Sequence, residues 1–193
     1  MASTGGWRRT VLVALLLVAC SGPVAPQAPP APAAGSGADP VSAAACHLVA
    51  GGARPDPECT PGAINREVTP DPAVLGRTVC RPGWTNTVRP ADSAALKRQV
   101  LLRYGIAVDQ SSLARYEMDH RVPLEIGGAP RDLANLWPEP WEKDSRHPEG
   151  NAAPGAGAQS KDKVENRVRA EICNGRIGLQ EGQKVFLGDW WSS

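Results

Sequence analysis

Residues 21–45 contain almost nothing that a folded core could use. Pro, Ala and Gly account for 18 of these 25 residues, and the segment has no leucine, isoleucine or aromatic residue. Such a composition buries too little apolar surface to offset the entropy lost on ordering, and its prolines favour extended backbone. We therefore expect a disordered tether here, and one folded domain over residues 46–193, a length that suits a single compact unit.

The first 19 residues have the organisation of an export signal. A pair of arginines precedes an apolar stretch over residues 11–19, which is too short to span a membrane. This stretch ends in Leu-Val-Ala-Cys, which resembles the bacterial lipobox, where the cysteine is lipidated and becomes the new first residue. We therefore expect a signal peptide, a lipid on Cys20 and anchoring to the bacterial cell envelope. An ordinary signal tail with an incidental cysteine is the alternative.

The charge balance excludes a protein that binds nucleic acid with its whole surface. The chain has 21 Lys and Arg against 20 Asp and Glu, and removal of residues 1–19 takes two arginines away, leaving 19 against 20. A near-neutral chain exerts little long-range attraction on a polyanion. Contacts to an anionic partner must therefore be made locally.

Four cysteines remain once Cys20 is assigned to the lipid: Cys46, Cys59, Cys80 and Cys173. An even number in an exported chain indicates disulfides. Of the three possible pairings we prefer Cys46–Cys59 with Cys80–Cys173, because it closes one local loop and joins the start of the domain to its last third. A zinc site is the competing interpretation, although the sequence lacks Cys-x-x-Cys and His-x3-His spacings.

The patterning predicts a mixed domain of the α+β class. Residues 59–90 are rich in Pro, Gly and Thr and are expected to form turns and short extended pieces. Residues 138–158 contain four prolines and a Gly/Ala run, which predict a long surface loop. Apolar periodicity predicts three helices and two extended segments. The helices cover 92–104, 161–173 and 179–190, and the extended segments cover 115–124 and 135–137.

The candidate chemistry lies in Asp-His-Arg-Val-Pro-Leu-Glu-Ile-Gly-Gly at 119–128 and Asn-Leu-Trp-Pro at 135–138. This stretch places an acid beside an imidazole at the end of an extended segment, followed by a glycine reversal. A hairpin of this size brings Asn135 back opposite His120. Asp-His pairs, Gly-Gly turns and Asn caps are each common, but their combination is rare.

This combination resembles the HNH, or His-Me finger, endonucleases, and specifically a bacterial exported group with Asp-His-x-x-Pro-Leu-Glu-x-Gly-Gly and Asn-Leu-Trp-Pro. The resemblance extends over most of residues 59–190 and includes Cys-Thr-Pro-Gly at 59–62 and Lys-Asp-x-Val-Glu-Asn at 161–166. It implies a β-hairpin packed on a helix around one divalent metal, a ββα-metal core with flanking helices.

The resemblance assigns roles by position. His120 is the general base that takes a proton from water, because an imidazole titrates near neutrality. Asp119 is a ligand of Mg²⁺ or Mn²⁺, since these cations prefer hard oxygen donors. Asn135 holds the hairpin and orients the His120 ring without touching the metal.

The last metal ligand of such sites comes from the following helix. Glu165, Asn166 and Arg169 share one face of that helix, and Asn166 is the first choice as ligand, followed by Glu165. A solvated face of alternating charge is the alternative. The position of Arg169 is often His in this group, so the arginine is either a phosphate contact or a weakening of the site. Arg121 and Lys161 are further predicted phosphate contacts.

The resulting prediction is a metal-dependent endonuclease that hydrolyses nucleic acid at the cell surface, as a monomer. The expected substrate is DNA rather than RNA, cut without sequence preference because nothing resembles a recognition helix. The implied products carry a 5′-phosphate and a 3′-hydroxyl. One alternative is an HNH fold with a damaged metal shell that binds nucleic acid without cutting it. The other is a structural envelope lipoprotein in which Asp119 and His120 only bind each other.

Overall fold

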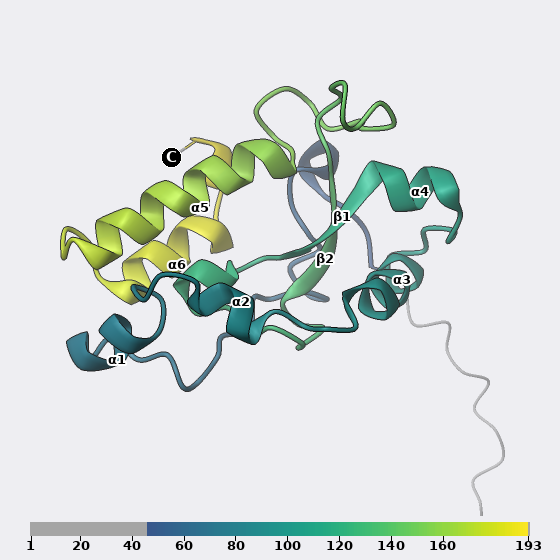
Figure 1. The fold of residues 1–193 in the computed structure, drawn as a ribbon. Coiled ribbons are helices and arrows are strands. Elements are labelled where there is room, and N and C mark those ends of the chain that lie inside the picture. The colour runs from purple at the N-terminus through teal and green to yellow at the C-terminus, as the bar shows by residue number, and fades with distance from the viewer. Residues whose placement is uncertain (1–45, 193) are drawn as a thin grey trace, which may run out of the picture. The chain divides into compact units, whose positions relative to one another are not determined.

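Two antiparallel strands lie at the centre of the domain, with helices on both sides of them (Figure 1). The computed structural model describes residues 46–192. The strands are β1 (Tyr116–His120) and β2 (Leu136–Pro140). The helices are α1 (Pro72–Arg77), α2 (Trp84–Val88), α3 (Ser93–Arg103), α4 (Gln110–Arg115), α5 (Ala158–Cys173) and α6 (Leu179–Leu187), and single 3₁₀ turns cover Ala50–Gly52, Leu124–Ile126 and Trp190–Ser192. Helices combined with a small antiparallel sheet fit the expected α+β class.

Three of the predictions made from the sequence concern residues 1–45. The expected signal peptide (1–19), the lipidation site Cys20 and the linker (20–45) lie outside the described residues. Within residues 46–192, no helix has both the length and the apolar character needed to cross a membrane.

Three helices were predicted, and α3, α5 and α6 confirm them. Their ends differ slightly, since α5 begins at Ala158 rather than at residue 161, and α6 ends at Leu187 rather than at residue 190. Three short helices were missed, and the prediction of turns alone over residues 59–90 is wrong, because α1 and α2 lie there.

Local capping explains two of the missed helices. Asp71 accepts hydrogen bonds from the backbone of the first turn of α1, and a proline at the first helical position adds the right backbone geometry. Asp109 and Ser112 cap α4 reciprocally, each accepting a bond from the backbone of the other. Both helices have only six residues, so apolar periodicity carries little signal in them.

The hairpin exists as predicted, but its register and its second strand differ from the prediction. Leu136, and not Asn135, lies opposite His120. β2 continues through Pro138 to Pro140, where a loop was expected. The strand tolerates both prolines because only every second residue of β2 forms hydrogen bonds to β1. The prolines occupy the positions in between, so their nitrogens point away from β1.

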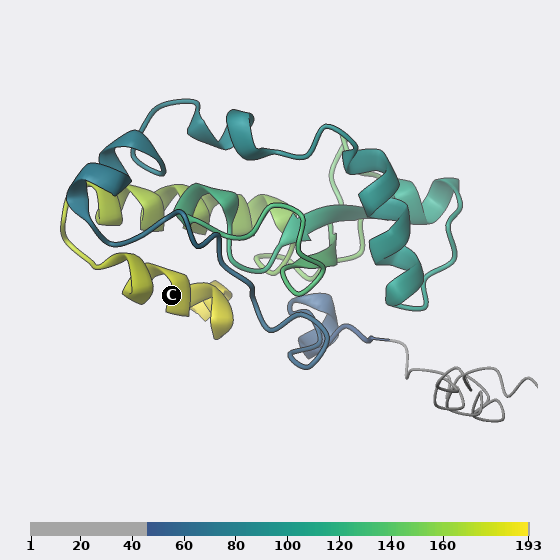
Figure 2. The same ribbon diagram turned by 90° about the horizontal axis from the view of Figure 1, so that it is seen from below.

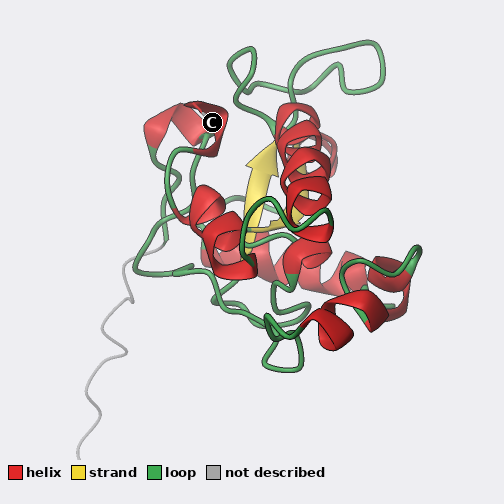
Figure 3. Cartoon of the chain, turned by 90° about the vertical axis from the view of Figure 1, so that its left-hand side faces the viewer, coloured by secondary structure: helices red, strands yellow, loops and turns green. Residues whose placement is uncertain are grey.

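Two small apolar clusters flank the hairpin. One forms where α5 and α6 pack on the loop between the strands, and the other forms where α3 packs on β2; Figures 2 and 3 show the two helix groups from below and from the α5 side. The first cluster includes Val122, Ile126, Val168, Ile172, Phe186 and Trp190. The second includes Leu96, Val100, Tyr104, Leu136 and Trp137.

Both predicted disulfides are present. Cys46 is bonded to Cys59, and Cys80 to Cys173, which joins α5 to the segment before α2. All four cysteines are therefore used, and the competing zinc site is excluded. Two disulfides indicate an oxidising, extracytoplasmic environment.

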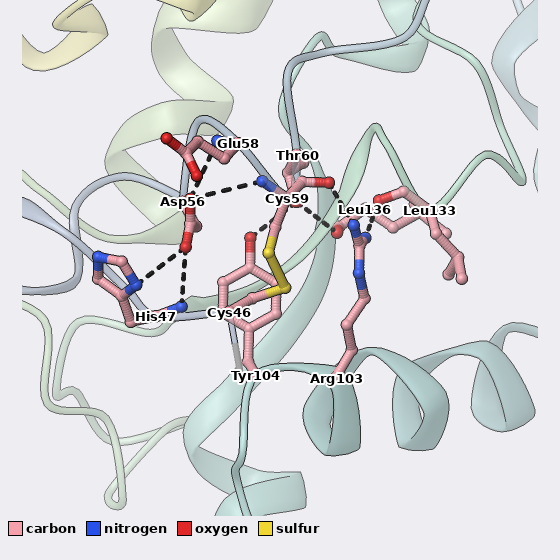
Figure 4. The surroundings of a disulfide bond; sticks show 10 residues. All are labelled: Cys46, His47, Asp56, Glu58, Cys59, Thr60, Arg103, Tyr104, Leu133 and Leu136. Carbon is pink, nitrogen blue, oxygen red and sulfur yellow. Dashed lines mark hydrogen bonds and ion pairs between the residues drawn. A yellow bond between two sulfur atoms is a disulfide. The ribbon is translucent and has the colours of Figure 1, made fainter. Parts of the chain in front are cut away.

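Polar contacts around Cys46–Cys59 tie the start of the domain to α3 and β2 (Figure 4). The hydroxyl of Thr60 lies 2.7 Å from that of Tyr104 and donates to the carbonyl of Leu136 at 3.3 Å. The Arg103 guanidinium donates to the carbonyls of Cys59 and Leu133. The amino-terminal end of the domain is thus fastened to the start of β2.

Candidate functional site

Asn135 fixes the loop that joins the two strands. Its side chain is fully buried, its Oδ1 accepts from the backbone N–H of Val122 at 2.8 Å, and its Nδ2 donates to the carbonyls of Val122 and Ala129 at 3.0 and 3.1 Å. Gly128 completes this arrangement, because a Cβ there would lie 1.8 Å from the Val122 carbonyl oxygen. Asn135 thus lies where a residue that holds the hairpin must lie.

The second role predicted for Asn135 needs a correction. Its side chain contacts loop backbone rather than the His120 ring. The ring is instead positioned by the loop itself, since Nε2 of His120 lies 3.1 Å from the carbonyl oxygen of Pro130. Because a carbonyl can only accept, Nε2 carries the proton in the neutral ring, and Nδ1 is the basic nitrogen. Asn135 therefore acts on His120 only through the loop.

His120 is held as a neutral base at the end of β1. Only 3% of its surface is exposed. Burial lowers the pKa of His120, and the positive charges of Lys161 and Arg89 lower it further, against the opposing effect of Asp119. Among the described residues, Nδ1 makes no hydrogen bond. The imidazole is therefore available to accept a proton at neutral pH.

A cleft of about 390 Å³ opens beside His120. Arg89, from the segment between α2 and α3, and Lys97, from α3, contribute positive charge to its lining. Nζ of Lys97 donates to the carbonyl of Leu113 at 2.7 Å, so its position is fixed. Trp141 also lines the cleft, and its ring stacks on that of His147 with centroids 4.0 Å apart.

A buried ammonium lies between β1 and α5. Glu117, Asp119 and Glu139 share one face of the hairpin because strand residues alternate in direction, and Glu117 also lines the cleft. α5 supplies Lys161 and Glu165. Nζ of Lys161 donates to the carboxylates of Asp119 and Glu165 and to the carbonyl of His120, the last at 3.0 Å. We call Asp119, Glu139, Lys161 and Glu165 the Lys161 cluster.

The charges of the Lys161 cluster are unequal. Burial alone would raise the pKa of Asp119, but the adjacent Lys161 ammonium holds it below its ordinary value. Burial raises the pKa of Glu165 to about 7. Glu139 is fully buried, lies 3.8 Å from Nζ, and has two oxygens without a hydrogen-bond partner among the described residues. Burial raises the pKa of Glu139 well above its usual range, against the opposing effect of the Lys161 ammonium.

The cluster contains the right donor type for Mg²⁺ or Mn²⁺, since carboxylate oxygens are hard ligands. Over residues 46–192, however, no group of three or more acidic, histidine or cysteine side chains is arranged to hold a metal ion. Lys161 is the reason, because its ammonium lies between Asp119 and Glu165 and uses oxygens that a metal would need. As arranged, these residues do not fit a divalent metal.

Two residues predicted from α5 lie away from the cluster. Asn166, the first choice as helix ligand, is exposed and donates to the carbonyl of Asp162 at 2.8 Å. Arg169 donates through Nε to the carbonyl of Val79 at 2.7 Å. Glu165, the second choice, is the one that meets Asp119 through the shared lysine.

Two predicted phosphate contacts are used inside the domain. Arg121 is buried and donates to the carbonyls of Thr60 and Leu187, at 2.6 and 2.8 Å. Lys161 is 1% exposed and paired within its cluster. Both side chains are therefore bound within the domain, and neither is presented to a phosphate in this arrangement.

Sequence reasoning missed Glu139, Arg89 and Lys97. Glu139 follows the Asn-Leu-Trp-Pro motif and would have been found had β2 been extended through the prolines. The two cations lie on a segment and a helix that carry no motif, so no local signal marks them.

No protein-family model, curated protein or solved structure matches this chain.

Proposed function

We propose that the domain hydrolyses phosphodiester bonds of nucleic acid at the cleft beside His120. The observation that carries the proposal is the state of the imidazole: Nε2 is held by the Pro130 carbonyl, and the basic Nδ1 has no partner among the described residues. A general base needs this combination of fixed orientation and available nitrogen.

The cleft also supplies positive charge for the phosphate. In the proposed reaction, Nδ1 of His120 takes a proton from a water molecule, whose oxygen forms a bond to phosphorus while the bond to the 3′-oxygen breaks. The 3′-oxygen leaves with the bonding electron pair and takes a proton from solvent, which gives the 3′-hydroxyl. Negative charge grows on the phosphoryl oxygens during this step, and the cations of Arg89 and Lys97 are placed to stabilise it. The lowered pKa of His120 keeps the base unprotonated at physiological pH.

The chemistry implied by the HNH resemblance includes a divalent metal, yet no step of the proposed reaction is assigned to one. Asp119 and Glu165 are bound to Lys161 in place of a cation from solution. The proposed ββα core consists of β1, β2 and α5, with the ammonium of Lys161 between the carboxylates of Asp119 and Glu165. DNA remains the proposed substrate, met at the cell surface by a monomer anchored through a lipid on Cys20.

A second candidate is a domain that binds nucleic acid without cutting it. The arrangement of the Lys161 cluster favours it, because HNH-type hydrolysis relies on a divalent metal that these side chains do not accommodate. The cleft with Arg89, Lys97 and Trp141 would then be a binding site alone. Retention of DNA without product distinguishes this candidate from the hydrolase.

Nicking of supercoiled plasmid by the oxidised protein tests the proposal. The comparison is between wild type, His120→Ala and His47→Ala, the last being an exposed histidine remote in sequence from the cleft. Loss of a general base should slow nicking by about 100-fold or more, whereas His47→Ala should match wild type. Equal nicking by wild type and His120→Ala would refute the hydrolase. DNA retention by a folded, non-cleaving wild type would establish the binding module.

Arg89→Ala gives a second measurement of the same site. Loss of one charged contact to phosphate should reduce DNA affinity or cleavage by about tenfold. Arg77→Ala, an exposed arginine at the end of α1, is the matched control. The same effect in both variants would mean that only general charge matters.

A further inference from the structure

We infer that the ammonium of Lys161 is the resident cation of the carboxylates beneath His120, and that the protein therefore does not take up a divalent metal there. This inference concerns how the proposed site is built. It can be tested by metal binding alone, so it stands or falls independently of whether nucleic acid is cleaved.

The ammonium is fully satisfied where it lies. A lysine side chain has three N–H donors, and Lys161 has three oxygen acceptors: the carboxylates of Asp119 and Glu165 and the carbonyl of His120. Only 1% of its surface is exposed. A buried ammonium whose three donors are all hydrogen-bonded is stable in this position.

The space around the ammonium is also filled. Oε2 of Glu139 lies 3.8 Å from Nζ, and the ring of Phe186 lies beneath the charge at 5.5 Å from its centroid. A metal that took Asp119 and Glu165 as ligands would leave the ammonium buried and unpaired beside a second positive charge, which is strongly unfavourable. Metal binding would therefore require Lys161 to leave the interior.

The spacing of residues in α5 determines where the Lys161 ammonium lies. Lys161 and Glu165 are four residues apart, so they lie on the same face of the helix and pair with each other. The helix places this pair against Asp119 of β1. The carboxylates that the resemblance suggested as ligands thus come together, but the chain supplies the cation between them.

The experiment is a titration of the oxidised protein with Mn²⁺, followed by the electron paramagnetic resonance signal of free Mn²⁺ and by the thermal unfolding midpoint. Wild type should bind no Mn²⁺ more tightly than about 1 mM and should show no rise in midpoint. Lys161→Ala removes the ammonium and leaves three carboxylates facing a vacated space. It should bind Mn²⁺ at least tenfold more tightly than wild type, and the added Asp119→Asn change should abolish that gain.

Lys163→Ala is the matched control, since Lys163 is an exposed lysine on the same helix and should leave the wild-type result unchanged. Tight Mn²⁺ binding by wild type that Asp119→Asn abolishes would overturn the inference. A folded Lys161→Ala variant that gains no Mn²⁺ affinity would also overturn it. If that variant does not fold, the wild-type titration decides alone: absence of tight Mn²⁺ binding supports the inference, and tight binding overturns it. Plasmid nicking is not read in this experiment, so a failed nuclease proposal cannot be mistaken for a failed inference.

Discussion

Asn135 and Val122 bind each other through two hydrogen bonds, with the Asn135 amide accepting from the Val122 N–H at 2.8 Å and donating to the Val122 carbonyl at 3.0 Å. This pair closes the loop that starts after β1 and returns to β2. The same loop carries the Pro130 carbonyl that holds the His120 ring. The position of the proposed base therefore depends on a side chain that does not contact it.

Asn135→Ala should lower the free energy of unfolding by about 3 kcal/mol, because it leaves the buried backbone groups of Val122 and Ala129 without partners. Urea denaturation of the oxidised protein measures the change. Asn151→Ala, at an exposed loop position, should alter stability by less than about 0.5 kcal/mol. Equal values for the two variants would show that the loop does not need Asn135.

Lys161→Met should be strongly destabilising, because it removes the cation from between Asp119 and Glu165 and leaves buried carboxylates unpaired. Breaking one partner of a buried ion pair costs about 3–5 kcal/mol. Chemical denaturation of Lys161→Met and of Lys163→Met, at an exposed position of α5, provides the comparison. A loss no larger in the first variant than in the second would contradict the assigned burial of the ammonium.

Glu117 makes stability depend on pH. Burial, together with the charges of Asp119, Asp162 and Glu165, raises the pKa of Glu117 from 4.5 to about 8 against the opposing effect of Lys161. The unfolded chain releases this proton at lower pH than the folded chain does, so stability should fall as pH rises between these two values.

Thermal unfolding between about pH 5 and pH 8.5 measures this dependence, which follows from the raised pKa. Glu117→Gln has no proton to release and should show a shallower fall in the unfolding midpoint than wild type. The residual slope belongs to other carboxyl groups with raised pKa values, among them Glu165, whose pKa is raised to about 7, and Glu139. Identical slopes in wild type and Glu117→Gln would show that Glu117 is not protonated in the folded protein.

The two disulfides should contribute unequally. Cys80–Cys173 spans 93 residues, whereas Cys46–Cys59 spans 13. Because a longer closed loop restricts the unfolded chain more, loss of the first is expected to cost about 4.7 kcal/mol and loss of the second about 3 kcal/mol. Denaturation of the two paired Cys→Ala variants tests this order. A larger loss from the Cys46–Cys59 pair would contradict it.

The hairpin and the long helices were predictable because their signals are local. The turn at Gly127–Gly128 and the apolar spacing of 161–173 each operate over a few residues, and the structure contains both the reversal and α5. The end of β2 was not predictable in this way. Proline usually ends a strand, and Pro138 and Pro140 are accommodated only because their nitrogens face away from β1.

The candidate site was predictable in part. Asp119, His120 and Asn135 follow from one motif, and the structure places them around the end of one strand and its loop. The neighbours of Lys161 could not be predicted, since a lysine on a charged helix is usually solvated. Its burial depends on how α5 packs against β1, which is a long-range contact that no local pattern records.

Chemical rescue of His120→Gly tests the central claim most directly, that His120 is the base of a nuclease. Gly removes the ring and leaves a space that free imidazole can enter. We predict that folded His120→Gly nicks plasmid at least about 100-fold more slowly than wild type. We also predict that added imidazole restores nicking in proportion to its unprotonated concentration, with no effect on Arg89→Ala. Wild-type nicking by His120→Gly without imidazole would contradict the claim.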